Sequence, residues 1–361
     1  MIYPLLPIFL TVTLGATPLV VGIIEGAADG LASILKLWAG AFSDRVRRRK
    51  PLIVAGYALA TASRALISVA GVWSTVLSAR LIDRTGKGIR SAPRDAMIAE
   101  VTPPEDRGRA FGFHRALDHT GAIVGPLIAL VLLQWLHVPT RQLFLIAVIP
   151  GAIAVVLLIV ALRESTVSPN LTVVAPSSAR APLGKPFRRA IFAIGLFSLA
   201  NSSDAFLILQ AHAAGVRTAM LPLLWAAHHV IKSLLSTYAG ALSDRIGRRA
   251  MISTGWMLYA ATYLAFPFAN TLALFFALFV FYALPFTLTE GAERALIADL
   301  VPADSRGRSF GIYYLTTGLG VLTGSAIFGL LFQYASPLIA FATGAALALS
   351  AAFAIRNGVR S

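Results

Sequence analysis

The sequence predicts an all-α membrane protein in which twelve transmembrane helices form two pseudo-symmetric halves of six. The chain of 361 residues is 57% hydrophobic and only 13% charged. Apolar stretches of the ~20 residues that a helix needs to cross a bilayer recur along the whole length. Two motifs of the first half also return, in the same order, in the second half. The mean hydropathy of the chain is +0.76. Together with the apolar stretches, this value excludes a chain of two or three soluble domains.

The apolar segments give the expected helices in chain order. The first, 1–14, makes only ~21 Å of helix, which is short of a hydrocarbon core of ~30 Å. We therefore expect a truncated first helix, part of which precedes Met1. The later segments are long enough to span a membrane, and they cover 18–43, 50–71, 74–99, 108–136, 140–162, 187–213, 218–243, 249–269, 271–298, 307–334 and 336–356.

Basic residues are concentrated in alternate connections between these segments. One set of connections, with the C-terminal tail, carries 19 of the 31 lysines and arginines, whereas the other set carries only Arg141 and Arg217. Basic connections stay in the cytoplasm, so we expect both termini there and the protein in the bacterial inner membrane. A net charge of +15 suits an anionic lipid surface and needs no nucleic-acid partner. The absence of cysteine excludes disulfides and thiolate metal sites.

The two returning motifs indicate an internal duplication. The stretch Gly40–Arg49 reads GAFSDRVRRR, and Gly240–Arg249 reads GALSDRIGRR. A second pair keeps nearly the same offset, since AMIAE followed by RGRAFG in the first half matches ALIAD followed by RGRSFG in the second. Two unrelated motifs with one spacing predict six-helix halves at 1–162 and 187–361, joined by a polar cytoplasmic linker at 163–186.

The repeated loop resembles the signature of the major facilitator superfamily, and the resemblance covers essentially the whole chain. One departure is Arg47, where the family pattern has glycine; the second copy keeps Gly247. The resemblance implies secondary transport by alternating access, with a loop acid and arginine that lock the cytoplasmic gate. Small residues beside them let helices approach closely. The matching positions here are Gly40, Asp44, Arg45, Gly240, Asp244 and Arg245.

A second resemblance concerns the direction of transport. Gly121, Gly125 and Pro126 are similar to the glycine–proline motif of proton-driven exporters of the drug antiporter branch. The second half has Gly324 but Ser325 in place of proline, and such asymmetry is typical of that branch. The glycines would allow close packing and the proline would bend the helix. The alternative is a plain helix-packing motif, because glycines at this spacing are common in membranes.

Ionisable residues within the apolar segments are candidates for the transport pathway, because each costs ~3 kcal/mol or more unless it is paired or hydrated. At helical spacing, one face of the segment 74–99 collects a charged stripe. The stripe consists of Arg80, Asp83, Arg84, Lys87, Arg90, Ser91, Arg94 and Asp95. Other segments contribute Glu25, Asp29, Asp118, Asp204, His229, Glu290 and Glu293 to the same predicted cavity.

These residues divide into expected roles. We expect Arg94 and Arg115 to form ion pairs at the gate. Asp29, Asp118 and Asp204 lead the candidates for proton coupling, because a carboxylate can load and unload a proton as its burial changes. An excess of positive charge in the cavity favours an anionic or zwitterionic substrate. The alternative is a self-compensated network that only stabilises the fold.

No enzyme, cofactor or metal site is expected. The chain lacks a nucleotide-binding loop and a nucleophile–base pair, and the neighbouring His228 and His229 point ~100° apart on a helix. The sequence therefore predicts a monomeric transporter that uses protons to export a small organic solute. One alternative is uptake of an organic anion coupled to protons or another cation. The other is a membrane sensor or assembly protein that keeps the fold without transporting.

Overall fold

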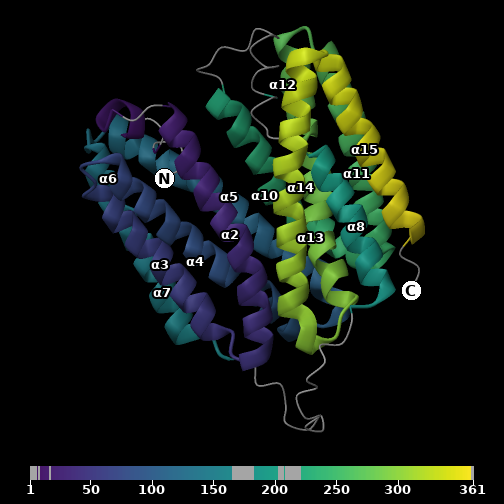
Figure 1. The fold of residues 1–361 in the computed structure, drawn as a ribbon, viewed down its shortest axis with the longest axis horizontal. Coiled ribbons are helices and arrows are strands. Elements are labelled where there is room, and N and C mark those ends of the chain that lie inside the picture. Colours follow the sequence, from purple (N-terminus) through teal and green to yellow (C-terminus); the bar gives the residue numbers. More distant parts are fainter. Residues whose placement is uncertain are drawn as a thin grey trace. The chain divides into compact units, whose positions relative to one another are not determined.

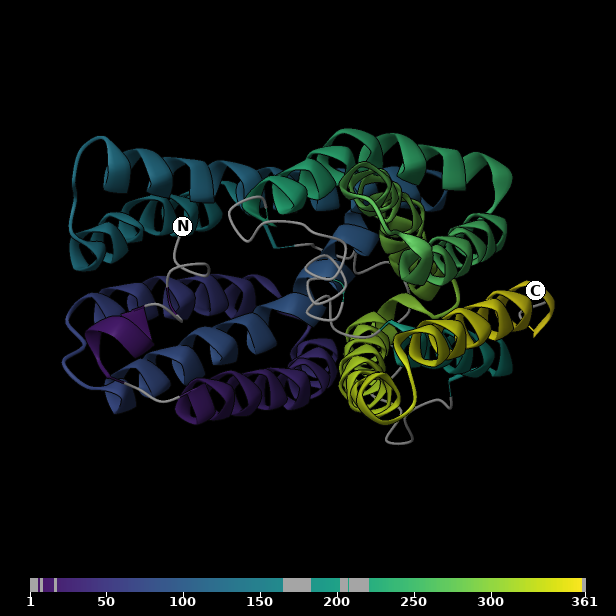
Figure 2. The same cartoon turned by 90° about the horizontal axis from the view of Figure 1, so that it is seen from above.

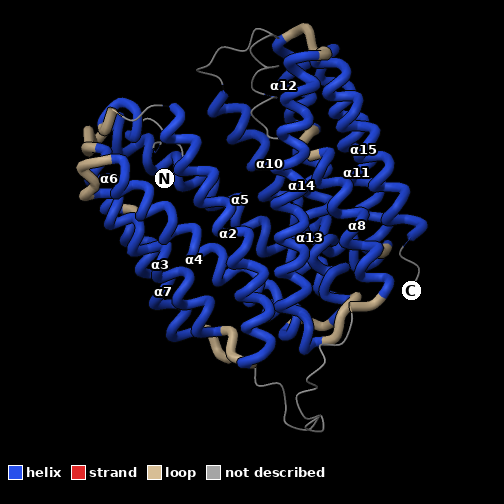
Figure 3. The backbone as a smooth tube through the Cα atoms, viewed as in Figure 1, coloured by secondary structure: helices blue, strands red, loops and turns tan. Residues whose placement is uncertain are grey.

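The computed structural model describes residues 6, 9–15, 18–164, 183–201, 207 and 221–358, which are helical and contain no strand. Figure 1 shows the helices with their labels, and Figure 3 shows the short loops between them. The first repeat contains a π-helical turn at Phe9–Thr13, α2 Pro18–Val46, α3 Lys50–Ser68, α4 Trp73–Val101, a 3₁₀ turn at Pro104–Asp106, α5 Arg107–Gln134, α6 Thr140–Ile146 and α7 Val148–Ala161.

The second repeat follows the same order. It contains α8 Lys185–Ala200, α10 Leu221–Ile246, α11 Arg248–Ala265, 3₁₀ turns at Phe266–Phe268 and Ala303–Ser305, α12 Leu272–Phe281, α13 Ala283–Asp299, α14 Arg306–Tyr334 and α15 Pro337–Gly358. Pairs α6–α7 and α12–α13 each make one long apolar span that is interrupted near its middle, at Ala147 and Tyr282. Where the chain is described, helices therefore stand at the expected segments.

Six of the described spans are apolar enough by composition alone to cross a membrane. Helix α4 is not among them, because charged side chains follow its length, yet it runs without interruption from Trp73 to Val101. The prediction that this basic stretch is a helix is confirmed. The predicted truncation of the first helix and the later part of segment 187–213 fall largely outside the described residues.

The described helices form two compact units. Unit 1 comprises residues 1–97, 122–173 and 304–314. In this unit α3 packs against α6 and α7, and its apolar core gathers Phe9, Ile24, Ile67, Val76 and Phe144. The structure thus holds α3 by burying its apolar face against the end of the same repeat.

Unit 2 comprises residues 98–121, 174–303 and 315–361. Helix α15 packs against α8 and α11, and α11 also packs against α13 (Figure 2). The core of unit 2 is aromatic. Its largest fully buried side chains include Trp256, Tyr259, Tyr263 and Tyr282. Each unit combines most of one repeat with the first turns of α5 or α14 from the other. The half boundaries at 162 and 187 stay a prediction.

Candidate functional site

In unit 1, Asp44 holds the first turn of α14. Its Oδ1 accepts a hydrogen bond from the amide of Gly307 at 2.9 Å, and its Oδ2 accepts one from the amide of Arg308 at 2.7 Å. Arg49 adds an ion pair at 3.0 Å. The first amides of a helix have no partner within the helix and attract negative charge. Asp44 therefore caps α14 from α2, and we call this arrangement the Asp44 clasp.

Two glycines make the Asp44 clasp close enough to form. A Cβ added to Gly40 would fall on the carbonyl oxygen of Gly307, and one added to Gly307 would meet the carbonyl oxygen of Gly40. The backbones of α2 and α14 therefore touch directly at this point, as small residues permit in membrane proteins. A side chain on either helix would move the amides away from Asp44.

Unit 2 contains the same arrangement, which we call the Asp244 clasp. The carboxylate of Asp244 accepts hydrogen bonds from the amides of Gly108 and Arg109, both at 2.8 Å, at the start of α5. Arg248 forms an ion pair with the same carboxylate. The Gly240 backbone lies against the Gly108 carbonyl, again with no room for a Cβ. The duplicated sequence motif thus produces a duplicated helix cap.

The clasp carboxylates lie in a different environment from the arginines beside them. Burial raises the pKa of the Asp44 carboxyl above its ordinary value, although the two amides and Arg49 act in the opposite direction. Arg45 and Arg245 are exposed.

The departure from the family pattern at Arg47 has a geometric meaning, because this residue has a φ of 49°, in the left-handed region that favours glycine. The second copy has Gly247 there, with a φ of 96°.

The charged stripe of α4 lies in unit 1 and is partly compensated. Buried Arg80 lies 3.4 Å from Asp83. The Nε of Arg84 lies 3.0 Å from the carboxylate of Asp29 in α2, and its Nη1 lies 4.0 Å from Asp83. Lys87 is exposed on the same helix. Asp29 and Asp83 therefore both lie within ion-pair distance of arginines of the stripe, as is expected in a self-compensated network.

The part of the stripe from Arg90 to Asp95 contacts aromatic residues. The guanidinium of Arg90 lies 4.2 Å from the centre of the Tyr57 ring in α3, a cation–π contact. Arg94 and Asp95 pair at 3.0 Å, and Asp95 also accepts a hydrogen bond from the Tyr314 hydroxyl in α14. These contacts bind α4 to two other helices of unit 1.

Unit 2 contains a buried ion cluster around Glu290 of α13. Its carboxylate forms an ion pair with Arg115 of α5 and accepts a hydrogen bond from Lys232 of α10 at 2.6 Å. His119 Nε2 lies 3.3 Å from the same carboxylate. Arg115 also pairs with the more exposed Asp118 at 2.9 Å. The structure thus brings the predicted residues Arg115, Asp118 and Glu290 together with Lys232 and His119. We call this set, which comes from three helices, the Glu290 cluster.

A second histidine extends the Glu290 cluster. His229 Nδ1 of α10 lies 3.2 Å from His119 Nδ1, and the ring centres are 5.2 Å apart. The neighbouring His228 is turned away, with its ring at 88° to that of His229, and lies against Phe279 and Tyr282. The two adjacent histidines therefore face different surroundings, as their helical spacing predicts.

The remaining predicted residues have surroundings of their own. Glu293 is buried and accepts a hydrogen bond from the Trp256 indole at 3.2 Å. A Cβ added at Gly121 would meet no described atom within 4 Å. Gly125 and Pro126 are half-buried inside α5, and their predicted roles stay predictions. Asp204 and the side chain of Glu25 lie outside the described residues.

Sequence reasoning missed partners that lie outside the apolar segments. Asp299 pairs with Arg107 at 2.6 Å and with Arg248 at 3.3 Å, beside the Asp244 clasp. A signal for it existed, because Asp299 ends a repeated motif. Glu164, which accepts hydrogen bonds from the start of α3, had no such signal, since the other repeat has no acid at the matching place.

Comparisons with known proteins agree with this architecture. The family model described as Major Facilitator Superfamily matches residues 1–228 and 207–357. An uncharacterized MFS-type transporter of Methanocaldococcus jannaschii is 30% identical over 355 residues, which are 97% of this chain and 88% of the relative. The multidrug resistance protein MdtH of Cronobacter sakazakii is 26% identical over 344 residues, which are 92% of this chain and 82% of that protein. The human organic anion transporter MFSD10 matches in structure with a TM-score of 0.78 at 16% identity, covering 92% of this chain and 83% of that one.

Proposed function

This chain belongs to the major facilitator superfamily and is an integral membrane transporter rather than an enzyme, and on that premise we propose that it exports a small organic solute in exchange for protons. The direction of transport is supported by its similarity to multidrug resistance proteins. The glycine–proline motif in α5 supports the same direction. The coupling to protons is argued from the Glu290 cluster, which is the observation that carries this proposal.

The hydrogen bonds of the Glu290 cluster form a directed chain. An ionised carboxylate only accepts, so the His119 Nε2 that faces Glu290 carries a proton. When His119 is neutral, its Nδ1 is then an acceptor, and the opposing Nδ1 of His229 must donate to it. A proton taken up by His229 can therefore pass through His119 to Glu290, because each imidazole accepts at one nitrogen and donates from the other.

Arrival of a proton would change the contacts between three helices. The charges of Arg115, Lys232, Glu290 and Asp118 sum to zero while both histidines are neutral. Protonation of Glu290 removes one negative charge and weakens its ion pairs with α5 and α10. The helices that meet at this carboxylate are then free to rearrange. A proton-driven transporter must couple such a rearrangement to the change of access from one side of the membrane to the other.

The same charge count supports a second candidate function. With Glu290 protonated, the cluster has a net positive charge, and Arg115 and Lys232 could then bind an anion instead. Proton and anion would load together, which is the behaviour of a symporter that takes up an organic anion. The two candidates therefore differ in whether substrate and proton compete or bind together.

The sign of a pH change separates the candidates. The full chain would be reconstituted in vesicles with a pH-sensitive dye in the lumen, and a panel of organic cations, zwitterions and carboxylates would be added outside. Exchange predicts that the lumen becomes alkaline as solute enters and protons leave. Acidification would support the symporter instead. Solute flux without any change in luminal pH would refute proton coupling.

Substitution of Glu290 tests the coupling residue. We expect Glu290→Gln to lower the proton signal by about tenfold or more, because a neutral amide cannot take up the proton. Exchange of labelled solute across the membrane, without a proton gradient, should persist. Glu105→Gln removes one exposed acid outside the cluster and serves as the matched control. Equal proton signals in E290Q and E105Q would place coupling elsewhere.

A further inference from the structure

Arg115 of α5 is shared between two acids of unequal exposure. Its Nε forms an ion pair with the Glu290 carboxylate of α13, and its Nη1 lies 2.9 Å from the carboxylate of Asp118, three residues further along α5. The Glu290 side chain is 17% exposed, whereas that of Asp118 is 44% exposed. Burial penalises the charged form of an acid, and contact with water favours it. Asp118 is therefore the acid that water keeps ionised when Glu290 takes up a proton.

The other charged and titratable side chains around these two acids come from the same helices and their neighbours. His119 of α5 and Lys232 of α10 contact the Glu290 carboxylate, and His114 of α5 lies 3.8 Å from that of Asp118. The remaining ones that the structure describes here are His228 and His229 of α10, Tyr259 of α11, and Glu293 and Arg294 of α13. Helix α12 adds none, since its sequence is LALFFALFVF. Within the described residues, no third carboxylate lies within ion-pair distance of the shared guanidinium.

Uptake of a proton by Glu290 changes what the shared guanidinium contacts. While Glu290 is ionised, Arg115 bridges both carboxylates. Once Glu290 is neutral, the pair with Asp118 remains, so the arginine keeps a counter-ion within the membrane. An arginine left without any counter-ion at that depth is much more costly than a paired one. Asp118 therefore lowers the free energy of the protonated cluster.

The other repeat shows that the arginine and its two acids occur as a set. The motif RGRAFG at 107–112 returns as RGRSFG at 306–311, and AMIAE at 96–100 returns as ALIAD at 295–299, so matching positions are 199 apart. The positions that match the arginine and the two acids all carry uncharged side chains, namely Tyr314, Thr317 and Ser91. There the Tyr314 hydroxyl donates a hydrogen bond to Asp95 instead. Three charges that are present together in one repeat and absent together from the other are expected to act as one unit.

We propose that Asp118 is a positioning residue of the proton site: it retains Arg115 when Glu290 takes up a proton, and so it sets the pH at which Glu290 is loaded. This inference rests on the proposed role of Glu290 in proton coupling, but it concerns the loading step and not the direction of transport. Without the charge of Asp118, neutral Glu290 leaves the guanidinium with no described carboxylate in ion-pair distance. Loading then requires a proton concentration that is higher by about tenfold, which is one pH unit.

An infrared titration of the purified full-length chain measures loading without transport. The C=O band of a protonated carboxyl grows as the pH falls, and Glu290→Gln identifies the part of this band that belongs to Glu290. We expect Asp118→Asn to move the midpoint of that part to a pH lower by about one unit. Asp118→Ser, a second neutral variant, should give the same shift. Asp118→Glu keeps the charge and should retain the midpoint of the wild type.

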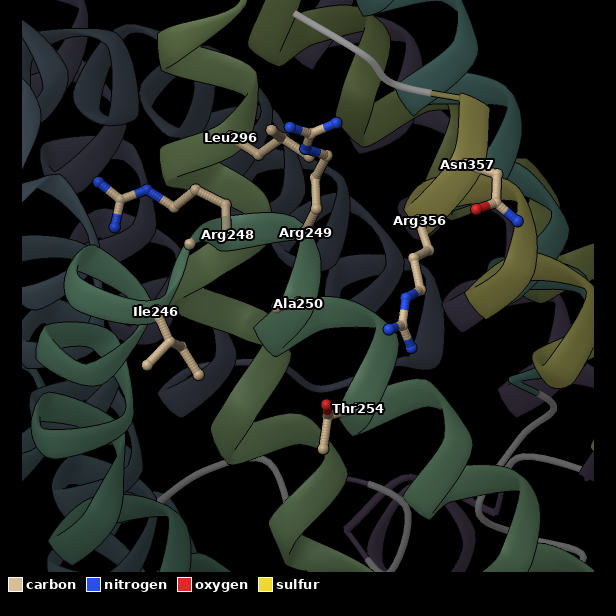
Figure 4. A pocket seen from close by; sticks show the side chains of 9 residues that line it. Ile246, Arg248, Arg249, Ala250, Thr254, Leu296, Arg356 and Asn357 are labelled. Carbon is tan, nitrogen blue, oxygen red and sulfur yellow. The ribbon is translucent and has the colours of Figure 1, made fainter.

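Two control variants each remove one charge of unit 2 outside the Glu290 cluster. Glu105→Gln removes an exposed acid, and Arg356→Gln removes an exposed arginine of α15 from a pocket that no residue of the cluster lines (Figure 4). Neither should move the midpoint. An unchanged midpoint in both neutral variants would show that Asp118 only stabilises α5 and would overturn the proposal. Equal shifts in D118N and D118E, or in D118N and E105Q, would also overturn it, because the charge at this position would not be the cause.

Transport assays separate this proposal from the proposed function. In vesicles, the proton signal driven by solute should decline as the pH rises and Glu290 becomes ionised, and in D118N it should reach half its maximum at a pH about one unit lower than in the wild type. A shifted infrared midpoint without any proton signal in the wild type would refute proton coupling and support the role of Asp118. A proton signal with the same pH profile in both proteins would refute the role of Asp118 alone.

Discussion

At the residue scale, the pairing of Arg84 with Asp29 is the point at which the charged stripe of α4 reaches α2. The guanidinium is nearly buried, with 11% of the side chain exposed, whereas the aspartate side chain is 65% exposed. Such a pair has one partner fixed in the helix bundle and one that water or a solute can reach. A buried cation left without its acid, or an acid left without its cation, costs more than the pair contributes.

We expect Arg84→Ala to abolish transport of any panel compound that the wild type carries, while the protein still inserts into the membrane. The reason is that Asp29 then loses this arginine as a partner and the ion pair between α4 and α2 is removed. Transport in vesicles and the amount of inserted protein would be measured together. Arg163→Ala, at an exposed position after α7, is the control. Normal transport in R84A would assign the stripe to a structural role.

Single residues also show how far the sequence could predict the site. Helical spacing predicted the shared face of Arg80, Asp83 and Arg84, because it depends only on positions within one helix. The sequence could not predict that His119 would stand between Glu290 and His229. That arrangement depends on α5, α10 and α13 packing side by side, and no local pattern specifies such packing.

At the element scale, glycines decide how closely the clasped helices approach. Helices α10 and α5 touch at Gly240 and Gly108, where backbone meets backbone. The clasp hydrogen bonds require that distance, since the two amides of α5 must reach both oxygens of one carboxylate. The motif predicted close packing here, but it did not identify the partner, because the first turn of α5 lies 136 residues earlier in the chain.

We expect Gly240→Ala to destabilise the protein by about 1–3 kcal/mol, because the new methyl group would overlap the Gly108 carbonyl and force two backbones apart. Thermal unfolding of the purified protein would measure the loss. Gly71→Ala adds the same methyl group where no atom lies within 4 Å and should change stability little. Equal unfolding temperatures for the two variants would show that the clasp is not tightly packed.

At the scale of the whole molecule, each compact unit contains one clasp and one ion cluster. Composition and periodicity predicted the helices and their order. The breaks in α6–α7 and α12–α13 were not predicted, since each pair reads as one continuous apolar span. The duplication predicted two similar loop motifs, yet it also concealed a difference between the halves, because Glu164 stands where the second half has Asn357. That difference is a single substitution within a repeated pattern.

We expect Asp44→Asn and Asp244→Asn each to slow transport with little change in apparent affinity, because an amide has one acceptor oxygen where two are used. The hydrogen bonds and ion pairs described for the two carboxylates have no residue in common. The double variant should therefore slow transport by the sum of the two single effects on the activation free energy, to within about 0.5 kcal/mol. Initial rates would be measured over a concentration series of a panel compound that the wild type transports, which gives the maximal rate and the apparent affinity. A large loss of affinity in either single variant would contradict the gating role.

The two clasps also differ in when they become available during synthesis. The amides of Gly108 and Arg109 are made before Asp244, so this carboxylate meets finished partners as soon as it leaves the ribosome. Asp44 is made 263 residues before Gly307 and must wait until the start of α14 has been made. Contacts between distant parts of a chain form late because closing a long loop is costly. Unit 1 therefore completes its clasp only after the start of α14 has been synthesised, and a chain terminated before Gly307 would lack it.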